Sequence, residues 1–588
     1  MKSSLRTALI IAAVALLACA PFLLGSFSIT LLNYIGVSTL VVLGLVLLTG
    51  VGGMTSFGQA AFVGIAAYST AWATAIEGAS PWLGLVLALA TTGLAALAIG
   101  FTTLRLGGHF LSLSTIAWGI SIYFLFGNVE GLGRNTGIPG IPPITIGSLS
   151  LGDSRSLFYL IWFVVLLATL ATANLLDSRE GRAVRSLRGG SVLLGSLGVD
   201  IFRTRLIVFV IAALFAGVAG WLYAHMNRFV SPAPFDVRPG IEYLLMAIVG
   251  GGGYISGAIA GSALITLMKN WLQDVLPRVS SNPAQVEIVV FSVLLILLLQ
   301  NARGGLVALV LRRLPRVMRN APSAAEALPR RSFPERGAPM LAIDRAVKKF
   351  GGLVAVNAVS FDVKAGEILA LIGPNGAGKS TMFNLLSGAL RANNGRIAFM
   401  GKEIGDLAQP QIARLGIART FQHVKLRPGM SLIDNVALGL YARTSAGFLR
   451  SIVRLDRPEE SRTMHEAYRQ LQRVGLGDKP HDLTGNLPLG RQRILEVARA
   501  LASDPLLLIL DEPAAGLRRR EKDALAAVLR QLRGEGVTIL IVEHDMDFVM
   551  GLVDRVVVMD FGSKIAEGDP ESVRANPKVQ EAYLGGVA

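Results

Sequence analysis

The chain has 588 residues, a net charge of +16 and 52% hydrophobic residues, a length that exceeds one hydrophobic core and predicts two or more domains. The positive charge does not indicate nucleic-acid binding, because no basic face with interleaved aromatic residues occurs, and arginines crowded into loops are typical of membrane proteins. The single cysteine, Cys19, excludes an internal disulfide and a cysteine-rich metal site.

Residues 1–312 are too apolar for a soluble domain, whereas residues 341–588 have an ordinary soluble composition. The basic start and the apolar run up to Cys19 resemble a secretion signal, but the bulky Leu17 and the following Pro21 disfavour cleavage. We therefore expect this first run to be a retained membrane helix.

Windows of about 20 apolar residues, the length that crosses a bilayer, recur through the first half. They lie at 7–25, 28–50, 57–76, 82–104, 110–127, 156–176, 206–226, 241–272 and 284–300. The basic N-terminus favours the cytoplasmic side, and the C-terminal half described below needs the same side. An even number of crossings is then required, so one of the nine windows is not a simple span.

The window 241–272 is the one that we expect to be broken. It is too long for one span at about 1.5 Å per residue, and the glycines 250–253 interrupt it. We expect two segments, or a re-entrant piece plus one span, of the kind that lines transport paths. A close-packed glycine contact between two helices is the alternative.

The remaining segments of this half are expected to lie outside the bilayer. Intramembrane charge is almost absent, which disfavours a free-standing secondary transporter with a proton relay. The Gly-, Pro- and Ser-rich segment 128–155 is expected on the outer side, and the arginine-rich segment 177–205 in the cytoplasm. The latter could dock onto a soluble domain and transmit motion, or lie on anionic lipid. Its apolar residues are Leu187, Val192, Leu193, Leu194, Leu197 and Val199.

Residues 313–340 change character, with many arginines and prolines and no apolar period. This composition predicts an extended linker that keeps the two halves close without tight docking. Its arginines could approach anionic headgroups.

A glycine-rich loop follows the short apolar strand 368–372 and precedes a predicted helix. Glycines let backbone N–H groups curl around phosphates, and the helix N-terminus adds positive potential. Lys379 is expected to neutralise the β- and γ-phosphates of a nucleotide, and Ser380 to offer its hydroxyl to Mg²⁺. The predicted phosphate loop comprises Gly373, Pro374, Asn375, Gly376, Ala377, Gly378, Lys379, Ser380 and Thr381.

A second apolar strand, 506–510, ends in the acid pair Asp511 and Glu512. Acids beside a buried strand are costly without a cation or hydrogen-bond donors. We expect Asp511 to hold hydrated Mg²⁺ and Glu512 to polarise the attacking water as general base. The alternative is an exposed acid pair at a strand end.

Together these residues resemble the ATPases of ABC transporters, and the resemblance assigns further roles. It implies that Phe350 stacks on adenine, that Gln422 senses Mg²⁺ and the γ-phosphate, and that His544 contacts the γ-phosphate. It places the dimer-contact loop at 514–517 and the signature motif at 487–493, with Gly490 gripping nucleotide bound to the opposite subunit.

The signature departs from the usual pattern, since Arg491 stands where a glutamine is expected. The arginine could disturb closure of the dimer or simply face solvent. Pro488 is usual in one branch of the family, the importers of branched-chain amino acids, and other motifs agree with that branch. They are Phe350–Asn357, Arg419–Gln422, Glu581–Gly585, Gly53–Phe62, Leu104–Gly107, Gly181–Arg185 and Gly250–Gly257.

The resemblance implies an all-α polytopic membrane domain followed by an α/β P-loop ATPase, with boundaries at 1–312, 313–340 and 341–588. It implies a fused permease and ATPase in the bacterial inner membrane, with a second permease, a second ATPase and a periplasmic binding protein as partners. The solute remains open among branched-chain and related small amino acids, as does homodimeric or heteromeric assembly.

Two other functions remain. A homodimeric exporter is disfavoured because most inside loops are short, and an ATP-gated regulatory membrane module would take up no solute. Stimulation of the ATPase by a binding protein with its solute distinguishes both from an importer.

Overall fold

The computed structural model describes residues 2–105, 110–278, 283–301, 304–313, 322 and 325–584. Three predicted features reach beyond these ranges: the motif ends at Gly107 and Gly585, and most of the linker between 314 and 324. The chain divides into two compact units, which are described separately. One combines Met1–Asp177 with Phe202–Met318, and the other combines Ser178–Ile201 with Arg319–Ala588.

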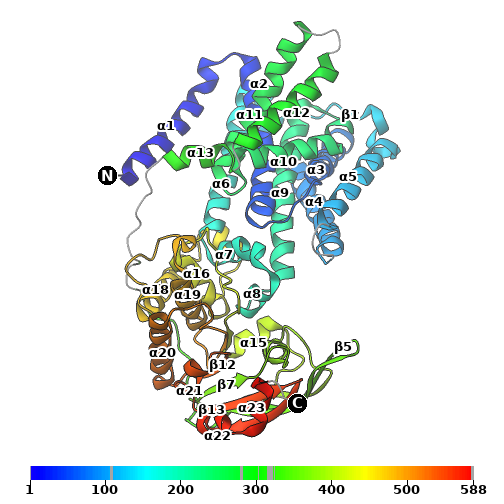
Figure 1. The fold of residues 1–588 in the computed structure, drawn as a ribbon. Helices are drawn as coiled ribbons and strands as arrows, with labels where there is room; N and C mark the ends of the chain where they lie inside the picture. Colours follow the sequence, from blue (N-terminus) through cyan, green and yellow to red (C-terminus); the bar gives the residue numbers. More distant parts are fainter. Residues whose placement is uncertain are drawn as a thin grey trace. The chain divides into compact units, whose positions relative to one another are not determined.

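The first unit is built of apolar helices, as predicted, and every predicted window falls on helical segments, the window 241–272 on two of them (Figure 1). Among the described residues, five are long and apolar enough to cross a membrane: Ser26–Val51, Pro81–Thr103, Phe110–Asn128, Ser154–Leu176 and Ile201–Asn227. The helices are α1 Lys2–Leu23, α2 Ser26–Leu45, η1 Val46–Val51, α3 Gln59–Ala71, η2 Trp72–Ile76, α4 Pro81–Thr103, α5 Phe110–Asn128, α6 Ser154–Leu176, α9 Ile201–Asn227, α10 Val237–Gly251, α11 Ile255–Val275, α12 Pro283–Asn301 and α13 Leu306–Arg313.

Short antiparallel strands occur in the segment after α5. β1 (Ile138–Pro139) pairs with β4 (Phe229–Val230), and β2 (Ile144–Ile146) pairs with β3 (Leu149–Leu151). The β1–β4 pair therefore ties the segment after α5 to the residues after α9, whereas β2 and β3 form a local hairpin before α6.

The window 241–272 is broken, as predicted, and the glycines at the break make a close-packed contact between its two helices. Helices α10 and α11 meet at a bend of 120°. A Cβ atom at Gly250 would collide with the backbone oxygen of Gly257, and one at Gly261 with that of Met246. Because 250 faces 257 while 246 faces 261, the two helices run antiparallel as a hairpin whose closed end depends on glycine.

The segment 178–201 belongs to the second unit, where it forms α7 (Arg179–Ser186) and α8 (Ser191–Ser196). Five of its six expected apolar residues are buried: Leu187, Leu193, Leu194, Leu197 and Val199. Val192 is exposed. The predicted docking onto the soluble domain is therefore confirmed, and the lipid-lying alternative is wrong for this face.

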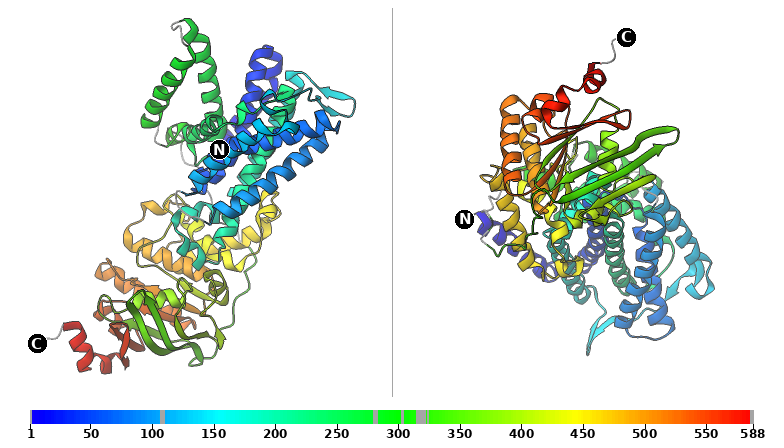
Figure 2. Two further views of the ribbon diagram at one scale, coloured as in Figure 1. Left: turned by 90° about the vertical axis from the view of Figure 1, so that its right-hand side faces the viewer. Right: turned by 90° about the horizontal axis from the view of Figure 1, so that it is seen from below.

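The second unit contains two sheets, whose long antiparallel strands β5 and β6 are green in Figure 2. The six-stranded sheet has the order β10-β11-β12-β7-β13-β14, in which only β14 is antiparallel to its neighbour. The four-stranded sheet has the order β6-β5-β8-β9 and is antiparallel. The strands are β5 Pro339–Phe350, β6 Leu353–Lys364, β7 Ile368–Ile372, β8 Asn394–Phe399, β9 Lys402–Glu403, β10 Ile417–Arg419, β11 Leu507–Asp511, β12 Thr538–Val542, β13 Arg555–Asp560 and β14 Ser563–Gly568.

Helices cover the parallel sheet on both faces, as the fully buried strands β7, β11 and β12 require. Alternate residues of β7 enter two different cores: Ile368 and Ile372 face one, and Leu369 and Leu371 the other. The helices are α14 Lys379–Leu386, α15 Gln409–Leu415, α16 Leu432–Leu438, α17 Phe448–Ile452, α18 Arg457–Arg473, α19 Leu489–Ala502, α20 Arg519–Gly534, α21 Met546–Met550, α22 Pro570–Arg574 and α23 Pro577–Leu584.

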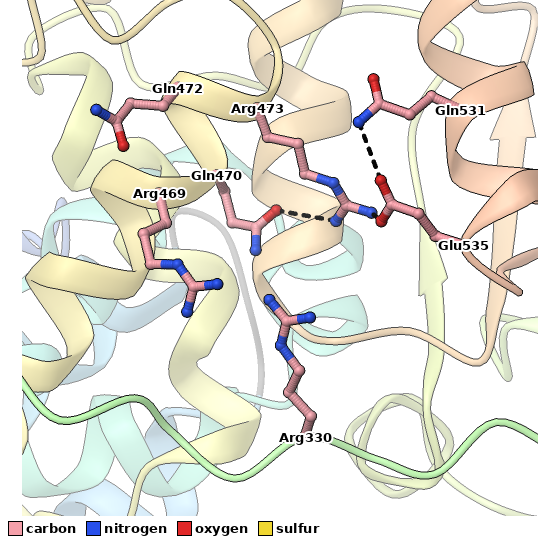
Figure 3. Close-up of a pocket in the computed structure, with 7 residues that line it drawn as sticks. All are labelled: Arg330, Arg469, Gln470, Gln472, Arg473, Gln531 and Glu535. Carbon is pink, nitrogen blue, oxygen red and sulfur yellow. Dashed lines mark hydrogen bonds and ion pairs between the residues drawn. The ribbon is translucent and has the colours of Figure 1, made fainter.

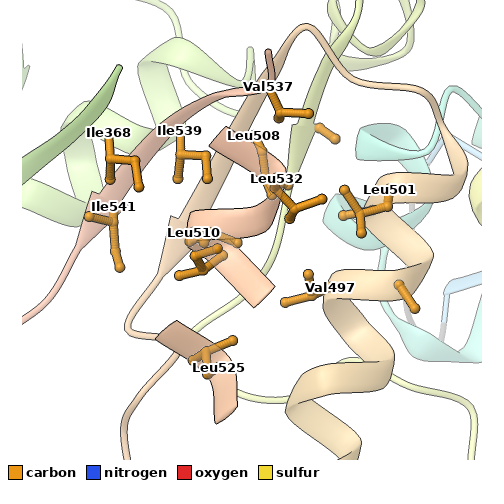
Figure 4. Packing of buried hydrophobic residues seen from close by; sticks show 14 of the residues in the cluster. Ile368, Val497, Leu501, Leu508, Leu510, Leu525, Leu532, Val537, Ile539 and Ile541 are labelled. Carbon is orange, nitrogen blue, oxygen red and sulfur yellow. The ribbon is translucent and has the colours of Figure 1, made fainter. Parts of the chain in front are cut away.

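The first of these cores joins the sheet to helices α19 and α20 (Figure 4). Leu508 and Leu510 of β11 lie in one cluster with Leu501 of α19 and Leu525 and Leu532 of α20. Full burial of each such side chain contributes about 1.5–3 kcal/mol. This packing holds the strand that ends in Asp511 rigidly below the loops of the site.

The described part of the linker is bound to the second unit, which differs from the expected free tether. Leu328 is buried in the ATPase core. The Arg331 backbone N–H donates to Asp504, and its guanidinium donates to the backbone oxygens of Ser503, Asp504 and Arg414. This arginine therefore fastens the linker to protein rather than to lipid.

The docked linker also forms one wall of a pocket of about 450 Å³ (Figure 3). Arg330 points into it from the linker, opposite Arg469 and Arg473 of α18. Glu535 forms an ion pair with Arg473 and accepts a hydrogen bond from Gln531. The pocket shows that side chains from the linker, α18 and α20 meet on one surface of the second unit.

Candidate nucleotide site

The predicted site residues gather at one edge of the parallel sheet. The strands β10, β11, β12 and β7 are neighbours in that order, and all run in the same direction. Their carboxyl ends therefore lie side by side, where open α/β sheets bind ligands. Gln422 follows β10, the acid pair ends β11, His544 follows β12 and the phosphate loop follows β7.

Three glycines of the phosphate loop need backbone angles that other residues rarely adopt. The φ angles are 151° at Gly373, 86° at Gly376 and 95° at Gly378. Such positive values suit glycine. The loop then enters α14, whose first residue is Lys379. The geometry is that of an N–H-lined anion cradle at a helix N-terminus.

The Lys379 ammonium is held inside this loop. Its Nζ donates to the backbone oxygens of Gly373 at 2.7 Å and Pro374 at 2.8 Å. Burial lowers the pKa of Lys379, and the nearby Glu512 and Asp511 act in the opposite direction. The side chain is thus poised over the loop, with a charge that a phosphate would compensate.

A cavity of about 670 Å³ adjoins the exposed side of the phosphate loop. Pro374, Asn375, Gly376 and Ala377 line it together with residues after β13 and on α23. These further residues are Asp560, Phe561, Ile565, Lys578, Glu581 and Ala582. Phe350 is not among them; it lies at the end of β5, half exposed and paired with Leu353. The exposed Phe561 has no signal in the sequence that marks it as a site residue.

Glu512 lies at the centre of the catalytic residues that the sequence predicts. Its Oε2 accepts a hydrogen bond of 3.1 Å from Gln422 Nε2 and lies 3.8 Å from His544 Nδ1. Its φ of 44° is unusual for a residue with a side chain, and its backbone N–H donates to Val542. Strained backbone of this kind occurs at functional sites when the surrounding structure enforces it.

Asp511 is buried beside the same edge. Burial raises the pKa of Asp511, and the guanidinium of Arg419 at 3.1 Å from its Oδ2 opposes that shift. Among the described residues, its other oxygen, Oδ1, has no hydrogen-bond donor. A buried carboxylate oxygen without a donor fits a cation ligand, because unpaired buried acceptors are costly.

Glu543 is a positioning residue that the sequence interpretation missed. Its fully buried carboxylate accepts hydrogen bonds from the backbone N–H of Ala514 at 2.6 Å and of His544 at 3.2 Å. Burial raises its pKa. It ties the predicted dimer-contact loop to His544 after β12. In the sequence, an acid at the end of an apolar strand could have indicated this role.

The signature segment 487–493 leads into α19, which begins at Leu489. Gly490 is buried against Glu521, where a Cβ atom would collide with the carboxylate. Arg491 is exposed. Arg493, two residues on, donates to the backbone oxygens of Phe421 and Gln422. The signature helix therefore fixes the backbone of the loop that carries Gln422.

A second polar cluster joins α7 to the ATPase fold. Arg182 forms an ion pair with Glu460 of α18, and both side chains are almost fully buried. Arg179 stacks on the Tyr441 ring, 3.5 Å from its centroid, and Tyr441 donates to Glu180. Burial raises the pKa of Tyr441, and the positive charge of Arg179 opposes that effect.

This sheet edge, with its phosphate loop, acid pair and switch histidine, defines an ATP-binding cassette. A family model described as "Branched-chain amino acid transport system / permease component" matches residues 27–299, and the "ABC transporter" model matches 356–515. A third, "Branched-chain amino acid ATP-binding cassette transporter", matches 563–588.

Relatives agree with these matches. "High-affinity branched-chain amino acid transport ATP-binding protein LivG" of Salmonella typhimurium is 41% identical over 250 residues, covering 42% of this chain and 98% of that protein. The corresponding BraF of Pseudomonas aeruginosa gives the same identity and coverage. A solved nucleotide-free ATP-binding cassette from an ABC transporter is 32% identical, covers 42% of this chain and 100% of its own, and has a TM-score of 0.38.

The chain belongs to the branched-chain amino acid ABC transporters, with a permease and an ATP-binding cassette fused on one polypeptide. It is an ATPase coupled to transmembrane transport. The predicted fold class, an all-α membrane domain followed by an α/β P-loop domain, is confirmed.

Proposed function

We propose that the chain imports branched-chain or related small amino acids across the bacterial inner membrane, using ATP hydrolysed on its cytoplasmic side. The family matches to both halves support this proposal. The observation that carries it is the cluster of Gln422, Glu512 and His544 beside the phosphate loop, on a chain that also holds a permease.

ATP would bind with its phosphates in the loop 373–381, where Lys379 compensates their charge. Phe350 would stack on adenine. Glu512 would take the proton of the attacking water as general base, while Gln422 orients its carboxylate and His544 contacts the γ-phosphate. Bound Mg²⁺ would neutralise phosphate charge, and Ser380, Gln422 and the unsatisfied Oδ1 of Asp511 are the residues that would hold it.

Gly490 would act in trans, gripping nucleotide bound to another cassette. The chain would therefore work with a second ATPase subunit, and membership of this transporter family implies a second permease and a periplasmic binding protein as well. The side chain of Arg491 is exposed on its own subunit, so it would either meet the second cassette or face solvent.

The α10–α11 hairpin supports a topology with both ends on one side. If the hairpin re-enters the side from which it came, it makes no crossing, and the other eight windows give an even number. The end of α6 and the start of α9 then lie on the cytoplasmic side, next to residues 178–201. These docked residues would carry motion between the two halves through the Arg182–Glu460 pair.

Reconstitution tests the proposal. The chain, co-expressed with its partner subunits, should take up labelled leucine into proteoliposomes only when ATP is present on the side of the ATPase domain and loaded binding protein on the other side. The binding protein should also stimulate ATP hydrolysis. Uptake of solute without a binding protein, or export, would favour the exporter; stimulated hydrolysis without any transport would favour the regulatory module.

A further inference from the structure

The membrane unit contains a polar cavity that neither the family matches nor the motifs explain. It has a volume of about 430 Å³ and lies between α2, α10 and α11. This size is within the usual range for small-molecule sites, about 300–1,000 Å³. Its lining residues are Phe27, Thr30, Leu31, Tyr34, Ser38, Pro239, Glu242, Tyr243, Met246, Thr266, Lys269, Asn270 and Gln273.

The cavity lies near the start of α6, opposite the end of that helix at Leu176. Asn33 and Thr30 of α2 form hydrogen bonds of 3.0 Å with Ser154, the first residue of α6. The opposite end of α6, at Leu176, leads into residues 178–201. In the topology proposed above, the cavity is therefore at the outer, solute-delivering side of the permease.

One ion pair stands in this otherwise uncharged wall. Lys269 Nζ lies 2.9 Å from both carboxylate oxygens of Glu242, from helices that are both apolar on average. Glu242 follows the start of α10 by about 8 Å of helix rise. At the centre of a membrane helix a charged residue costs about 2.5–3.5 kcal/mol, and an ionisable residue within a membrane segment is by default a functional-site hypothesis.

The pair faces the cavity instead of being enclosed by protein. The side-chain exposures are 33% for Lys269 and 29% for Glu242. In apolar surroundings, the attraction within an ion pair outweighs the desolvation cost of its charges only when further hydrogen bonds satisfy both groups. Hydroxyl and amide groups of Thr30, Ser38 and Asn270 extend the polar wall, so that a bound polar molecule can reach both charges.

The hairpin forms a rigid floor under the pair. Met246 lines the cavity, and its backbone oxygen lies against Gly261, where even a Cβ atom cannot be accommodated. Tyr34 is held in the wall by its hydroxyl, which donates to Asn227 at 2.7 Å. Phe27, Leu31 and Met246 supply apolar surface next to the charges.

We propose that this cavity receives the transported amino acid as a zwitterion, with its carboxylate on Lys269 and its ammonium on Glu242. The aliphatic side chain lies against Phe27, Leu31 and Met246. This inference rests on the proposed import of small amino acids. It assigns the recognition step inside the membrane, after release from a binding protein.

The charge balance explains why a zwitterion is the right class. Glu242 and Lys269 together are neutral, and inserting a zwitterion exchanges one ion pair for two without a net buried charge. A ligand with a single charge would pair with only one of the two side chains. The other side chain would be left without a counter-charge in a poorly solvated site, at a cost of several kcal/mol. A neutral aliphatic molecule would separate the pair without replacing its contacts.

Cysteine protection tests the site directly. In a Cys19→Ser chain assembled with its partner subunits in lipid nanodiscs, Thr266→Cys is placed in the cavity, and Leu267→Cys on the same helix outside it serves as the control. Leucine at about ten times its dissociation constant should slow thiosulfonate modification of Thr266→Cys about tenfold. It should not change the rate at Leu267→Cys.

Two analogues isolate the charges. 4-Methylpentanoate lacks the ammonium and isoamylamine lacks the carboxylate, and at equal concentration neither should protect Thr266→Cys. Equal protection by either analogue, or no protection by leucine, would overturn the zwitterion site. If the complex imports leucine while Thr266→Cys stays unprotected, only the site is wrong; if it imports no amino acid, the proposed function fails.

A charge exchange separates recognition from structure. The double variant Glu242→Lys with Lys269→Glu retains an ion pair, so thermal stability should remain unchanged, while leucine uptake should fall about tenfold, equivalent to about 1.4 kcal/mol. If the double variant takes up leucine as fast as the unaltered chain, the pair only holds α10 to α11 and does not recognise the solute.

Discussion

The two halves of this chain carry function in different ways. In the ATPase half, the predicted catalytic residues and the phosphate loop lie at or shortly after the ends of buried strands, and neighbouring parallel strands bring those positions to one edge. In the membrane half, the close contacts are backbone against glycine, and the two charges of the cavity lie 27 residues apart on different helices. A nucleotide site can therefore be recognised from short sequence motifs, whereas a solute cavity depends on how separate helices pack together.

The largest expected effect is on ATP hydrolysis, from a single substitution at Glu512. Glu512→Gln removes the proposed base but leaves a side-chain oxygen that can accept the hydrogen bond from Gln422. ATP hydrolysis should therefore fall about 10²- to 10⁴-fold. Phosphate release by the reconstituted transporter measures it, with the exposed Glu571→Gln as the matched control. Hydrolysis at the unaltered rate would refute the assignment of the base.

The docking between α7 and α18 should be the next most sensitive feature. Arg182→Met leaves Glu460 buried without its partner, a loss of about 3–5 kcal/mol. We expect a lower melting temperature of the chain and reduced leucine uptake per ATP hydrolysed. The double variant Arg182→Met with Glu460→Met should recover most of the stability, because no charge is left unpaired.

Exposed charge pairs provide the contrast. Arg396 and Glu403 form an ion pair on the surface of the four-stranded sheet, so Arg396→Met should cost less than about 1 kcal/mol. Equal losses for Arg182→Met and Arg396→Met would mean that α7 is not fastened by its buried pair.

The membrane half should be sensitive to volume instead of charge at its hairpin. Gly261→Ala forces a methyl group against the Met246 backbone, so unfolding free energy should fall by about 1–3 kcal/mol. Gly253→Ala meets no atom within 4 Å and is the matched control. Thermal unfolding in detergent compares the two, and equal melting temperatures would show that the hairpin is loosely packed.

The smallest effect is expected at the unusual signature residue. Because Arg491 is exposed, Arg491→Gln should leave ATP hydrolysis equal or raise it no more than about twofold, within the range of about 0.5 kcal/mol for surface changes. A collapse of hydrolysis would show that the arginine has a positive role, such as contact with the opposite cassette.

Much of the ATPase site was predictable, because its residues follow a strand-loop-helix order that can be read locally. The structure brings the phosphate loop, Asp511, Glu512, Gln422 and His544 to one edge of the parallel sheet. The positioning role of Glu543 and the place of Phe561 in the cavity were missed, because each depends on contacts with residues far along the chain.

The linker also shows that composition alone does not predict long-range contacts. Its proline and arginine content predicts an extended segment, yet Leu328 enters the core and Arg331 reaches the loop after α19. Composition describes how a free chain behaves, but it does not reveal complementary backbone oxygens elsewhere in the fold.

From the amino-acid sequence alone came the division into an apolar and a nucleotide-binding half and the break in the window 241–272, whereas docking of residues 178–201 was one of two alternatives that only the structure separated. The division and the break follow from hydropathy, spacing and charge, which are local properties. Only the tertiary structure decided that the break is an antiparallel glycine hairpin and that Glu242 meets Lys269 in a cavity beside α2. Such contacts depend on how helices pack, and no single segment contains that information.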